Sequence, residues 1–125
     1  MKLDCPFCDM TQERIVSNFN HFYVVRDAYP VTENHTLIIS HNHGISLDSM
    51  TSDELLELME ITKIVKNQIL DMDIKVTGFN IGINEGTDAG QTVMHFHCHV
   101  IPRREGDTKN PRGGVRGVIP NKQSY

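Results

Sequence analysis

Three histidines at alternate positions, His95, His97 and His99, constrain this 125-residue chain more than any other feature. Successive side chains of a β-strand point to opposite faces of a sheet, so a strand here would place three imidazoles on one face. The intervening Phe96 and Cys98 would then enter a core on the other face, with Cys98 as a buried structural thiol. A helix would splay the imidazoles around its axis. The pattern therefore predicts a strand with a functional face.

The remaining sequence predicts four more strands and one long helix. Pro102 has no N–H for a sheet ladder, so we expect the histidine strand to stop near it. Thr51 and Glu54 have capping-box spacing at the start of the helix, which continues to about Leu70. The other strands are expected near residues 13–17, 19–26, 36–40 and 76–83. Together these elements predict an α+β fold with a mostly antiparallel five-stranded sheet, one long helix and a short one.

Most apolar residues of the predicted helix lie on one stripe, which we expect to be buried, but three others lie outside it. Leu56, Ile61 and Ile64 lie outside this stripe. A dimer contact or deeper burial within one monomer would each explain them. The stripe itself consists of Leu55, Leu58, Met59, Thr62, Val65 and Ile69.

Length, composition and charge exclude several classes of protein. A chain of 125 residues suits one domain over residues 1–125, and no apolar run approaches the roughly 20 residues of a membrane span. The N-terminus has no signal-peptide pattern, so we expect a cytoplasmic protein. Residues 1–101 hold fourteen acidic against six basic residues, which argues against nucleic-acid binding. Residues 102–125 hold six basic against two acidic residues, and this basic tail either helps to hold a small polyanion or is simply solvated.

Two sequence features indicate phosphate chemistry. The glycine-rich loop that ends at Gly90, Gln91 and Thr92 can offer N–H groups, an amide and a hydroxyl to an anion directly before the histidines. A neutral imidazole can attack phosphorus and form a covalent phosphoramidate. His97 is the best candidate nucleophile, because a histidine on each side could bind phosphate oxygens or move protons.

The cysteines indicate a metal site. Cys5 and Cys8 form a Cys-x-x-Cys pair, which supplies two thiolates to a tetrahedral zinc ion or, alternatively, forms a redox pair. The two further ligands would come from His35, His41, His43 and His95. Of the remaining histidines, His21 is expected at the surface, as is His41 unless it binds metal.

These residues resemble the histidine triad (HIT) superfamily of nucleotide hydrolases and transferases. The alternation of histidine with apolar residues fits its signature, apart from the small Cys98. Asn34 stands where the family has glycine, a position that suits a left-handed backbone. Cys5-Pro-Phe-Cys8 and the ending at 111–120 are similar to a bacterial zinc-bearing branch of the family. The other matching segments are Asn34-His-Thr-Leu-Ile-Ile-Ser-His-Asn-His43, Asn84-Glu-Gly86 and Gly90-Gln-Thr-Val93.

The resemblance implies a role for each matching residue. His97 would be the nucleophile, His99 would contact the phosphate and the leaving group, and His35 would support them as a third catalytic histidine. Asp27 would take the ribose hydroxyls. The other nucleotide-binding positions are Phe7, Val25, Ala28, Asn84, Gly90, Gln91, Thr92 and His99. The ligands of a structural zinc would be Cys5, Cys8, His43 and His95.

The implied function is a hydrolase that cleaves purine nucleotides at the α-phosphate through a nucleotidyl-histidine and releases a nucleoside monophosphate. Dinucleoside polyphosphates such as diadenosine tetraphosphate are the favoured substrates, followed by adenosine phosphoramidates. The alternatives are a nucleotidyl transferase or phosphorylase, a non-catalytic zinc-stabilised purine-nucleotide-binding module, and a catalytic metal held by all three triad histidines. The expected assembly is a homodimer, without nucleic-acid or membrane partners.

Overall fold

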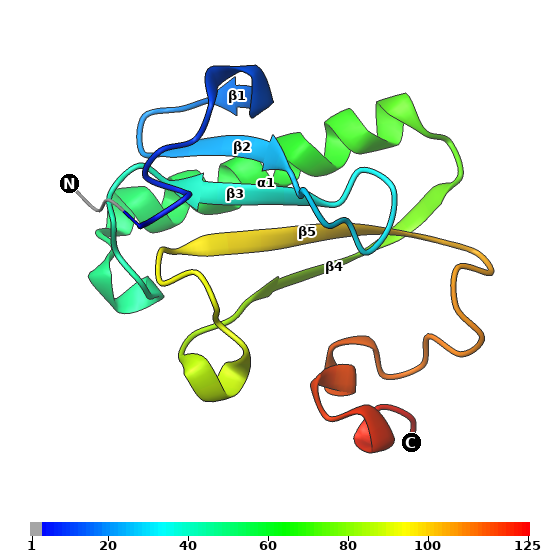
Figure 1. Ribbon diagram of the computed structural model, residues 1–125. Coiled ribbons are helices and arrows are strands. Elements are labelled where there is room, and N and C mark those ends of the chain that lie inside the picture. The colour runs from blue at the N-terminus through cyan, green and yellow to red at the C-terminus, as the bar shows by residue number, and fades with distance from the viewer. Residues whose placement is uncertain (1–3) are drawn as a thin grey trace.

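The five predicted strands form one antiparallel sheet with the order β1-β2-β3-β5-β4 (Figure 1). The structure is a computed structural model that describes residues 4–125, so the first three residues of the predicted domain lie outside it. One long helix accompanies the sheet, and short 3₁₀ turns lie in the loops and the C-terminal segment, which confirms the α+β class. The elements are β1 (Ile15–Asn18), β2 (Phe22–Arg26), β3 (Thr36–Ser40), α1 (Ser52–Met72), β4 (Val76–Ile83) and β5 (His97–Arg104).

The strands that lie within clear β-branched runs have the predicted limits, and β1 and β2 are shorter than predicted. β3 and β4 cover the residues that the sequence predicts. β1 begins two residues late because Gln12–Arg14 form a 3₁₀ turn. β2 begins at Phe22, because Phe19 already belongs to the hairpin turn, where its N–H donates to the Phe22 carbonyl (2.8 Å).

The histidine strand is predicted to stop near Pro102, and β5 ends two residues beyond it, at Arg104, so the proline does not itself end the strand. β5 pairs with β3 only over His97–Val100, and beyond that point it pairs with β4 alone. The Pro102 carbonyl accepts a hydrogen bond from the Thr32 hydroxyl (2.6 Å), on the side that β3 has left. The missing N–H faces that same side, so the sheet loses no ladder bond.

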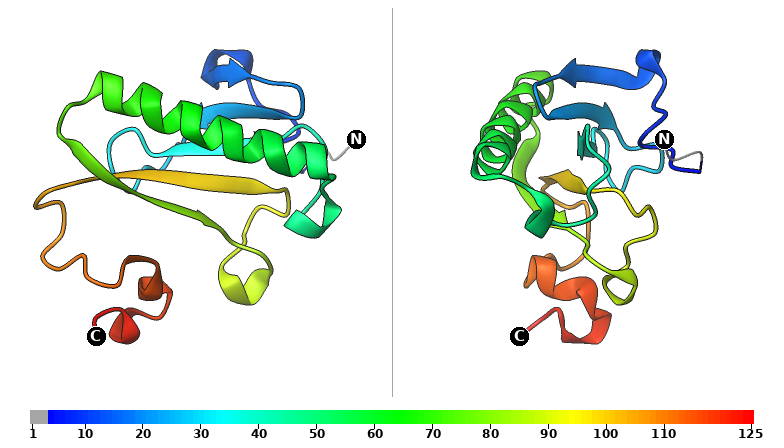
Figure 2. Two further views of the ribbon diagram at one scale, coloured as in Figure 1. Left: turned by 180° about the vertical axis from the view of Figure 1, so that it is seen from behind. Right: turned by 90° about the vertical axis from the view of Figure 1, so that its left-hand side faces the viewer.

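Helix α1 covers one face of the sheet, as the view from behind shows (Figure 2). Thr51 and Glu54 form the predicted capping box: the Glu54 N–H donates to the Thr51 hydroxyl (3.2 Å), and the Thr51 N–H donates to the Glu54 carboxylate (2.8 Å). The expected stripe is displaced by part of a turn. Ile61 is 1% exposed, whereas Met59 is 52% exposed. The helix residues in the core are Leu58, Ile61, Thr62, Val65 and Ile69.

Several apolar residues of α1 face away from the core. Leu56, Met59 and Ile64 are exposed, so burial within the monomer explains only Ile61 among the residues outside the stripe. The homodimer stays a prediction. Within the described part of the chain, no helix combines the length and apolar character that a bilayer crossing requires.

The sheet separates two apolar clusters. Residues such as Val24, Ile38 and Cys98 pack against α1, and their neighbours in sequence point the other way. The opposite face carries a smaller cluster of Tyr23, Val25, Leu37 and Ile39, on which Phe7, Met10 and Ile15 pack. This second face is the one on which His97 and His99 lie.

Candidate active site and metal site

The central and last histidines of the triad stand side by side on the sheet face opposite α1. His97 and His99 are half-buried, and their ring centroids are 5.2 Å apart. Cys98, between them, is 1% exposed, and burial raises the pKa of its thiol to about 11. Cys98 is therefore the inert structural thiol that the alternation predicts.

The prediction that His95 shares this row is wrong, because β5 begins only at His97. The backbone before His97 turns towards the loop after β3: the Phe96 N–H donates to the Gly44 carbonyl (2.6 Å), and the Phe96 carbonyl accepts from the N–H of Ser40 at the end of β3 (3.4 Å). The His95 ring turns into the interior and is fully buried. Its Nε2 lies 2.6 Å from the Ser40 carbonyl, to which it donates, so the lone pair is on Nδ1.

A backbone contact fixes the tautomer of His97. Its Nδ1 lies 2.8 Å from the carbonyl oxygen of His95, which can only accept. The proton of the neutral ring is therefore on Nδ1, and Nε2 carries a free lone pair. An imidazole in this state can act as a nucleophile.

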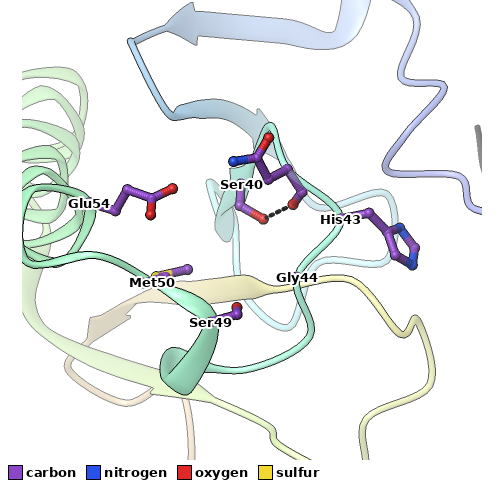
Figure 3. A pocket seen from close by; sticks show the side chains of 7 residues that line it. Ser40, His43, Gly44, Ser49, Met50 and Glu54 are labelled. Carbon is purple, nitrogen blue, oxygen red and sulfur yellow. Dashed lines mark hydrogen bonds between the residues drawn. The ribbon is translucent and has the colours of Figure 1, made fainter.

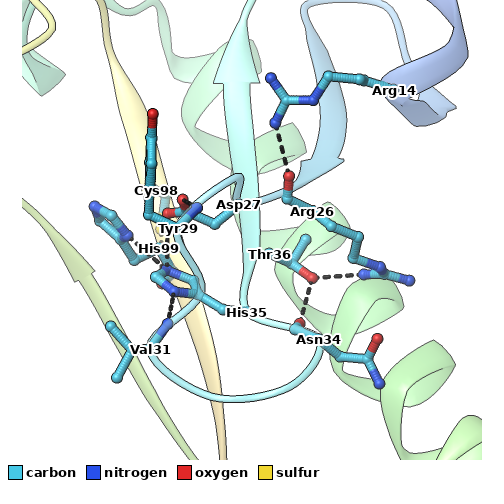
Figure 4. Close-up of polar contacts among 10 residues, drawn as sticks. All are labelled: Arg14, Arg26, Asp27, Tyr29, Val31, Asn34, His35, Thr36, Cys98 and His99. Carbon is cyan, nitrogen blue, oxygen red and sulfur yellow. Dashed lines mark hydrogen bonds and ion pairs between the residues drawn. The ribbon is translucent and has the colours of Figure 1, made fainter.

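A chain of hydrogen bonds fixes the tautomer of His99 (Figure 4). The Val31 N–H donates to Nδ1 of His35 (3.0 Å), so His35 carries its proton on Nε2. That Nε2–H donates to Nδ1 of His99 (2.9 Å), with a carboxylate oxygen of Asp27 at 3.4 Å. His99 is left with a proton on Nε2, which makes it a hydrogen-bond donor.

Asp27, His35 and His99 also bring three possible metal-binding atoms within 4.8 Å of one another. The backbone bond from Val31 argues against a metal there. It occupies the Nδ1 lone pair of His35, and a neutral ring then has its proton on the nitrogen that would have to bind the ion. The contacts favour a hydrogen-bonded relay.

The burial of His35 and His99 predicts a fold that loses stability in acid. Desolvation lowers the pKa of both imidazoles, and with the added effect of His97 and His35 the pKa of His99 falls to about 4. In the unfolded chain an imidazole has a pKa near 6.5. As the pH falls from about 6.5 towards 4, the unfolded state binds protons that the folded state excludes, so the free energy of unfolding decreases.

The measurement is thermal unfolding at pH 7 and pH 5. We expect the melting temperature of His99→Asn to fall less between these values than that of the wild type. His41→Asn is the control, because this histidine is exposed and bonds to Asn18 (2.8 Å). All three proteins keep the same metal-binding residues, so metal effects cancel. Equal decreases for His99→Asn and the wild type would contradict the prediction.

The glycine-rich loop is built differently from the expected anion nest. The N–H groups of Gly90 and Gln91 donate to carbonyls of the same loop. The Gln91 amide is buried as well: it accepts from the Gly86 N–H (2.9 Å) and donates to the Ile45 carbonyl (3.3 Å). Gly86 and Gly90 adopt positive φ angles, which explains the glycines. Thr92 is the member of the predicted nest that faces solvent.

The other predicted nucleotide-binding residues surround the His97 face. Asn84 follows Ile83, which pairs with Cys98, and so lies beside the start of β5. Asp27 follows β2 and contacts His35. Val25 is fully buried and can only back a pocket, whereas Phe7 is half-buried and places its ring against His97 (4.9 Å between centroids).

The sequence leaves two roles open for the basic tail, contact with a polyanion or simple solvation, and in the structure its arginines have partners within the chain. Arg103 donates to Asp107 and Asn80, and Arg104 donates to Asp73. The guanidiniums of Arg112 and Arg116 each stack on Tyr125, 4.8 Å from the ring centroid. The C-terminal segment lies below β4 in Figure 1.

Four residues form a site that could hold a metal ion: Cys5, Cys8, His43 and His95. Nδ1 of His95 lies 3.3 Å from the Cys5 sulfur, 3.5 Å from the Cys8 sulfur and 3.1 Å from Nδ1 of His43. Nδ1 of His43 lies 3.1 Å from the Cys8 sulfur. Ligands at about 2.0–2.3 Å from a tetrahedral zinc ion are roughly 3.3–3.8 Å apart. The separations here, 3.1–3.5 Å, lie at the lower end of that range or slightly below it, so the donor set and its size fit zinc.

Of the four histidines that spacing leaves open as ligands, the structure brings two, His43 and His95, next to Cys5 and Cys8. His35 lies in the relay, and His41 is exposed. Three contacts that shape the site come from backbone groups, the carbonyls of Ser40 and His95 and the N–H of Val31, and sequence reasoning missed them. Every residue has these backbone groups, so the pattern of residue types in the sequence does not indicate such contacts.

A pocket of about 260 Å³ is lined in part by His43 (Figure 3). The His43 ring points away from it. Neither His97 nor His99 lines this pocket. It is lined by Ser40, Asn42, His43, Gly44, Ser49, Met50 and Glu54.

Comparison with known proteins identifies the family. The family model described as HIT domain matches residues 10–106. An uncharacterized HIT-like protein of Mycoplasma genitalium is 37% identical over 105 residues, which cover 81% of this chain and 74% of that protein. The chain belongs to the HIT family. The resemblance drawn from the sequence is confirmed.

Solved HIT structures and characterised HIT proteins extend the comparison. A zinc-bound histidine triad family protein of Mycobacterium smegmatis has a TM-score of 0.77 and 28% identity, covering 86% of this chain and 81% of that one. A bis(5'-nucleosyl)-tetraphosphatase [asymmetrical] of Schizosaccharomyces pombe is 37% identical over 62% of this chain and 42% of that protein. An AP-4-A phosphorylase of Mycobacterium tuberculosis is 33% identical over 74% of this chain and 48% of that protein.

Proposed function

We propose that this HIT protein is a nucleotide hydrolase that cleaves at the α-phosphate through a nucleotidyl-histidine. One observation carries the proposal: His97 presents a free Nε2 lone pair beside His99, which presents an Nε2–H donor. A nucleophile and a donor on one open sheet face are what phosphoryl transfer through a covalent adduct requires.

In the proposed reaction, Nε2 of His97 attacks the α-phosphorus, and an N–P bond forms as the bond to the leaving group breaks. The Nε2–H of His99 donates to the phosphate or to the leaving oxygen, and His35 holds His99 in this tautomer. The low pKa of His99 keeps its ring neutral near pH 7, so it acts as an oriented donor. Water then attacks the phosphorus, and the N–P bond breaks to release a nucleoside monophosphate and free His97.

The nucleotide would lie over the second apolar cluster, with its phosphate at His97. We assign the purine to the side of Phe7, backed by Val25 and edged by the exposed Ala28, and the ribose hydroxyls to Asp27. The phosphate side is formed by Asn84 and the loop at Gly90, Gln91 and Thr92. The internal bonds of Gln91 make it the residue that shapes this loop, and Thr92 is the one that meets the phosphate.

We propose that Cys5, Cys8, His43 and His95 hold a structural zinc ion. The four donor atoms leave no position for substrate, which is the arrangement of a structural site. When bound, the ion would fix the N-terminal turn to the loop after β3. All three cysteines are free thiols, and thiolate ligands suit a reducing compartment, so we place the protein in the cytoplasm.

Dinucleoside polyphosphates are the substrates we favour, with adenosine phosphoramidates second, because relatives named for both hydrolysis and phosphorolysis act on dinucleoside tetraphosphates. The test is product analysis with diadenosine tetraphosphate and an adenosine phosphoramidate, each with and without inorganic phosphate. A hydrolase releases AMP in either condition. Formation of ADP that depends on added phosphate would instead identify a phosphorylase, and tight AMP binding without any turnover would identify a binding module.

A further inference from the structure

The turn that carries two of the metal ligands also reaches the candidate nucleophile. Phe7 stands between Cys5 and Cys8, in a turn closed by the Cys8 N–H, which donates to the Cys5 carbonyl (3.2 Å). The Phe7 ring meets the His97 ring at 78°, with centroids 4.9 Å apart, and meets the His95 ring at 85° and 5.9 Å. Edge-to-face contacts of this kind favour one relative orientation of the rings.

Its hydrogen bond alone does not fix the His97 ring. The bond from Nδ1 to the His95 carbonyl sets the tautomer but leaves the ring able to tilt about the bond. Phe7 and His99 provide further contacts, at 4.9 Å and 5.2 Å between centroids. The direction of the Nε2 lone pair therefore depends on where Phe7 stands.

The position of Phe7 in turn depends on the metal cluster. His95 is held without any metal, because it is fully buried and bonds to the Ser40 carbonyl. The opposite side of the cluster has fewer polar bonds to the rest of the chain. Cys5 is buried but Cys8 is exposed, and the turn is held otherwise by the Tyr23 hydroxyl, which donates to the Phe7 carbonyl, and by apolar packing. A bound ion would tie this side to the fixed side.

We propose that Phe7 is a positioning residue for the nucleophile His97, and that the metal-bound turn holds Phe7 in place. The proposal rests on the proposed function and adds a second role to the base contact assigned to Phe7. Occupancy of the metal site would then influence the rate of the chemical step through Phe7, without a contact between the ion and the substrate or His97. Misplacement of a reacting group by about 1 Å can cost up to roughly 100-fold in rate.

The experiment compares Phe7→Ala and Phe7→Leu with the wild type and with Met10→Ala. Met10 packs on the same apolar cluster and is the matched control. Zinc content is measured by release to a chelating dye, AMP affinity by calorimetry, and kcat and KM with diadenosine tetraphosphate. We expect every variant to keep its zinc. Phe7→Ala should lower kcat roughly 10–100-fold, Phe7→Leu should recover part of the loss, and Met10→Ala should stay within about twofold of the wild type.

A second arm removes zinc with a chelator, and circular dichroism checks that the fold persists. Metal removal should lower the kcat of the wild type by a similar factor, and that of Phe7→Ala by less than about threefold, because the contact has already gone. A Phe7→Ala variant that loses AMP affinity but keeps kcat would show a base contact only and would overturn the proposal. The proposal would also be overturned if chelation lowered the kcat of Phe7→Ala by the same factor as that of the wild type. If the metal-free protein unfolds, the proposal is judged on the kcat values of the zinc-loaded variants.

A spectroscopic readout separates this proposal from the proposed function. In spectra of protein with ¹³C-labelled histidine, the His97 ring signals should be single and sharp in the zinc-loaded wild type. They should be broadened or doubled in Phe7→Leu and in the chelated wild type. Absence of turnover in the wild type, with these spectral changes present, would refute the hydrolase and leave the positioning role standing. Turnover by the wild type with unchanged His97 signals in the variant and in the chelated protein would refute the positioning role and leave the hydrolase standing.

Discussion

The variant His97→Asn is expected to lose turnover of every substrate, with kcat at least about 10⁴-fold below that of the wild type. The asparagine amide can still donate to the His95 carbonyl, so the local structure is kept. The nucleophilic lone pair on Nε2 is lost, and with it the covalent route. The measurement is the initial rate with diadenosine tetraphosphate, together with acid-quench trapping of the radiolabelled adduct on the protein.

Two further variants make this test specific. His99→Asn should retain more activity, with a loss of about 10²–10³-fold, because it removes a donor and leaves the nucleophile. His21→Asn should behave as the wild type, since this residue pairs with Glu57 of α1 (2.6 Å). AMP binding to His97→Asn should stay within about fivefold of the wild-type value. Wild-type turnover by His97→Asn would remove this residue from the proposed role.

Removal of the metal is the change with the next largest expected effect. With free zinc at about 1,000 times its dissociation constant, binding to the folded state alone adds about 4 kcal/mol to the free energy of unfolding. For a domain of this size, that corresponds to roughly 10–15 °C in melting temperature. We expect chelation to lower the melting temperature of the wild type by this amount, measured by differential scanning calorimetry.

Cysteine variants locate the ion. Cys5→Ser should contain no zinc, and its melting temperature should not respond to chelation. Cys98→Ala is the matched control, since this thiol is buried against α1 on the other face of the sheet. It should keep one zinc ion per chain and the full response to chelation. A Cys5→Ser protein that still binds zinc would point to another site, such as the triad histidines.

The sequence predicts those parts of the fold that depend on local pattern. The runs over Thr36–Ser40 and Val76–Ile83 are strands with the expected limits, and the capping box at Thr51 begins the helix. The left-handed backbone expected at Asn34 is present, with φ of 71°. In each of these places, neighbours within a few residues determine the conformation.

Contacts between distant segments decide the parts that the sequence does not predict. His95 leaves the strand because carbonyls of Ser40 and Gly44, about 50 residues away in the chain, bind its ring and the following N–H. The helix stripe includes Ile61 and omits Met59, since the position of the sheet determines which side of α1 is covered. Tertiary contacts therefore decide that His95 joins the cysteine cluster while His97 and His99 lie on the open sheet face.

The position of Pro102 also has a consequence for solubility. Beyond Val100, β5 has lost one of its neighbours, and strand segments with unpaired backbone groups are templates for the addition of another chain. At this residue there is no donor, and the Thr32 hydroxyl occupies the acceptor. Pro102 is also buried, so an incoming strand would find neither hydrogen-bonding group there, and this part of β5 offers no site for intermolecular β-pairing.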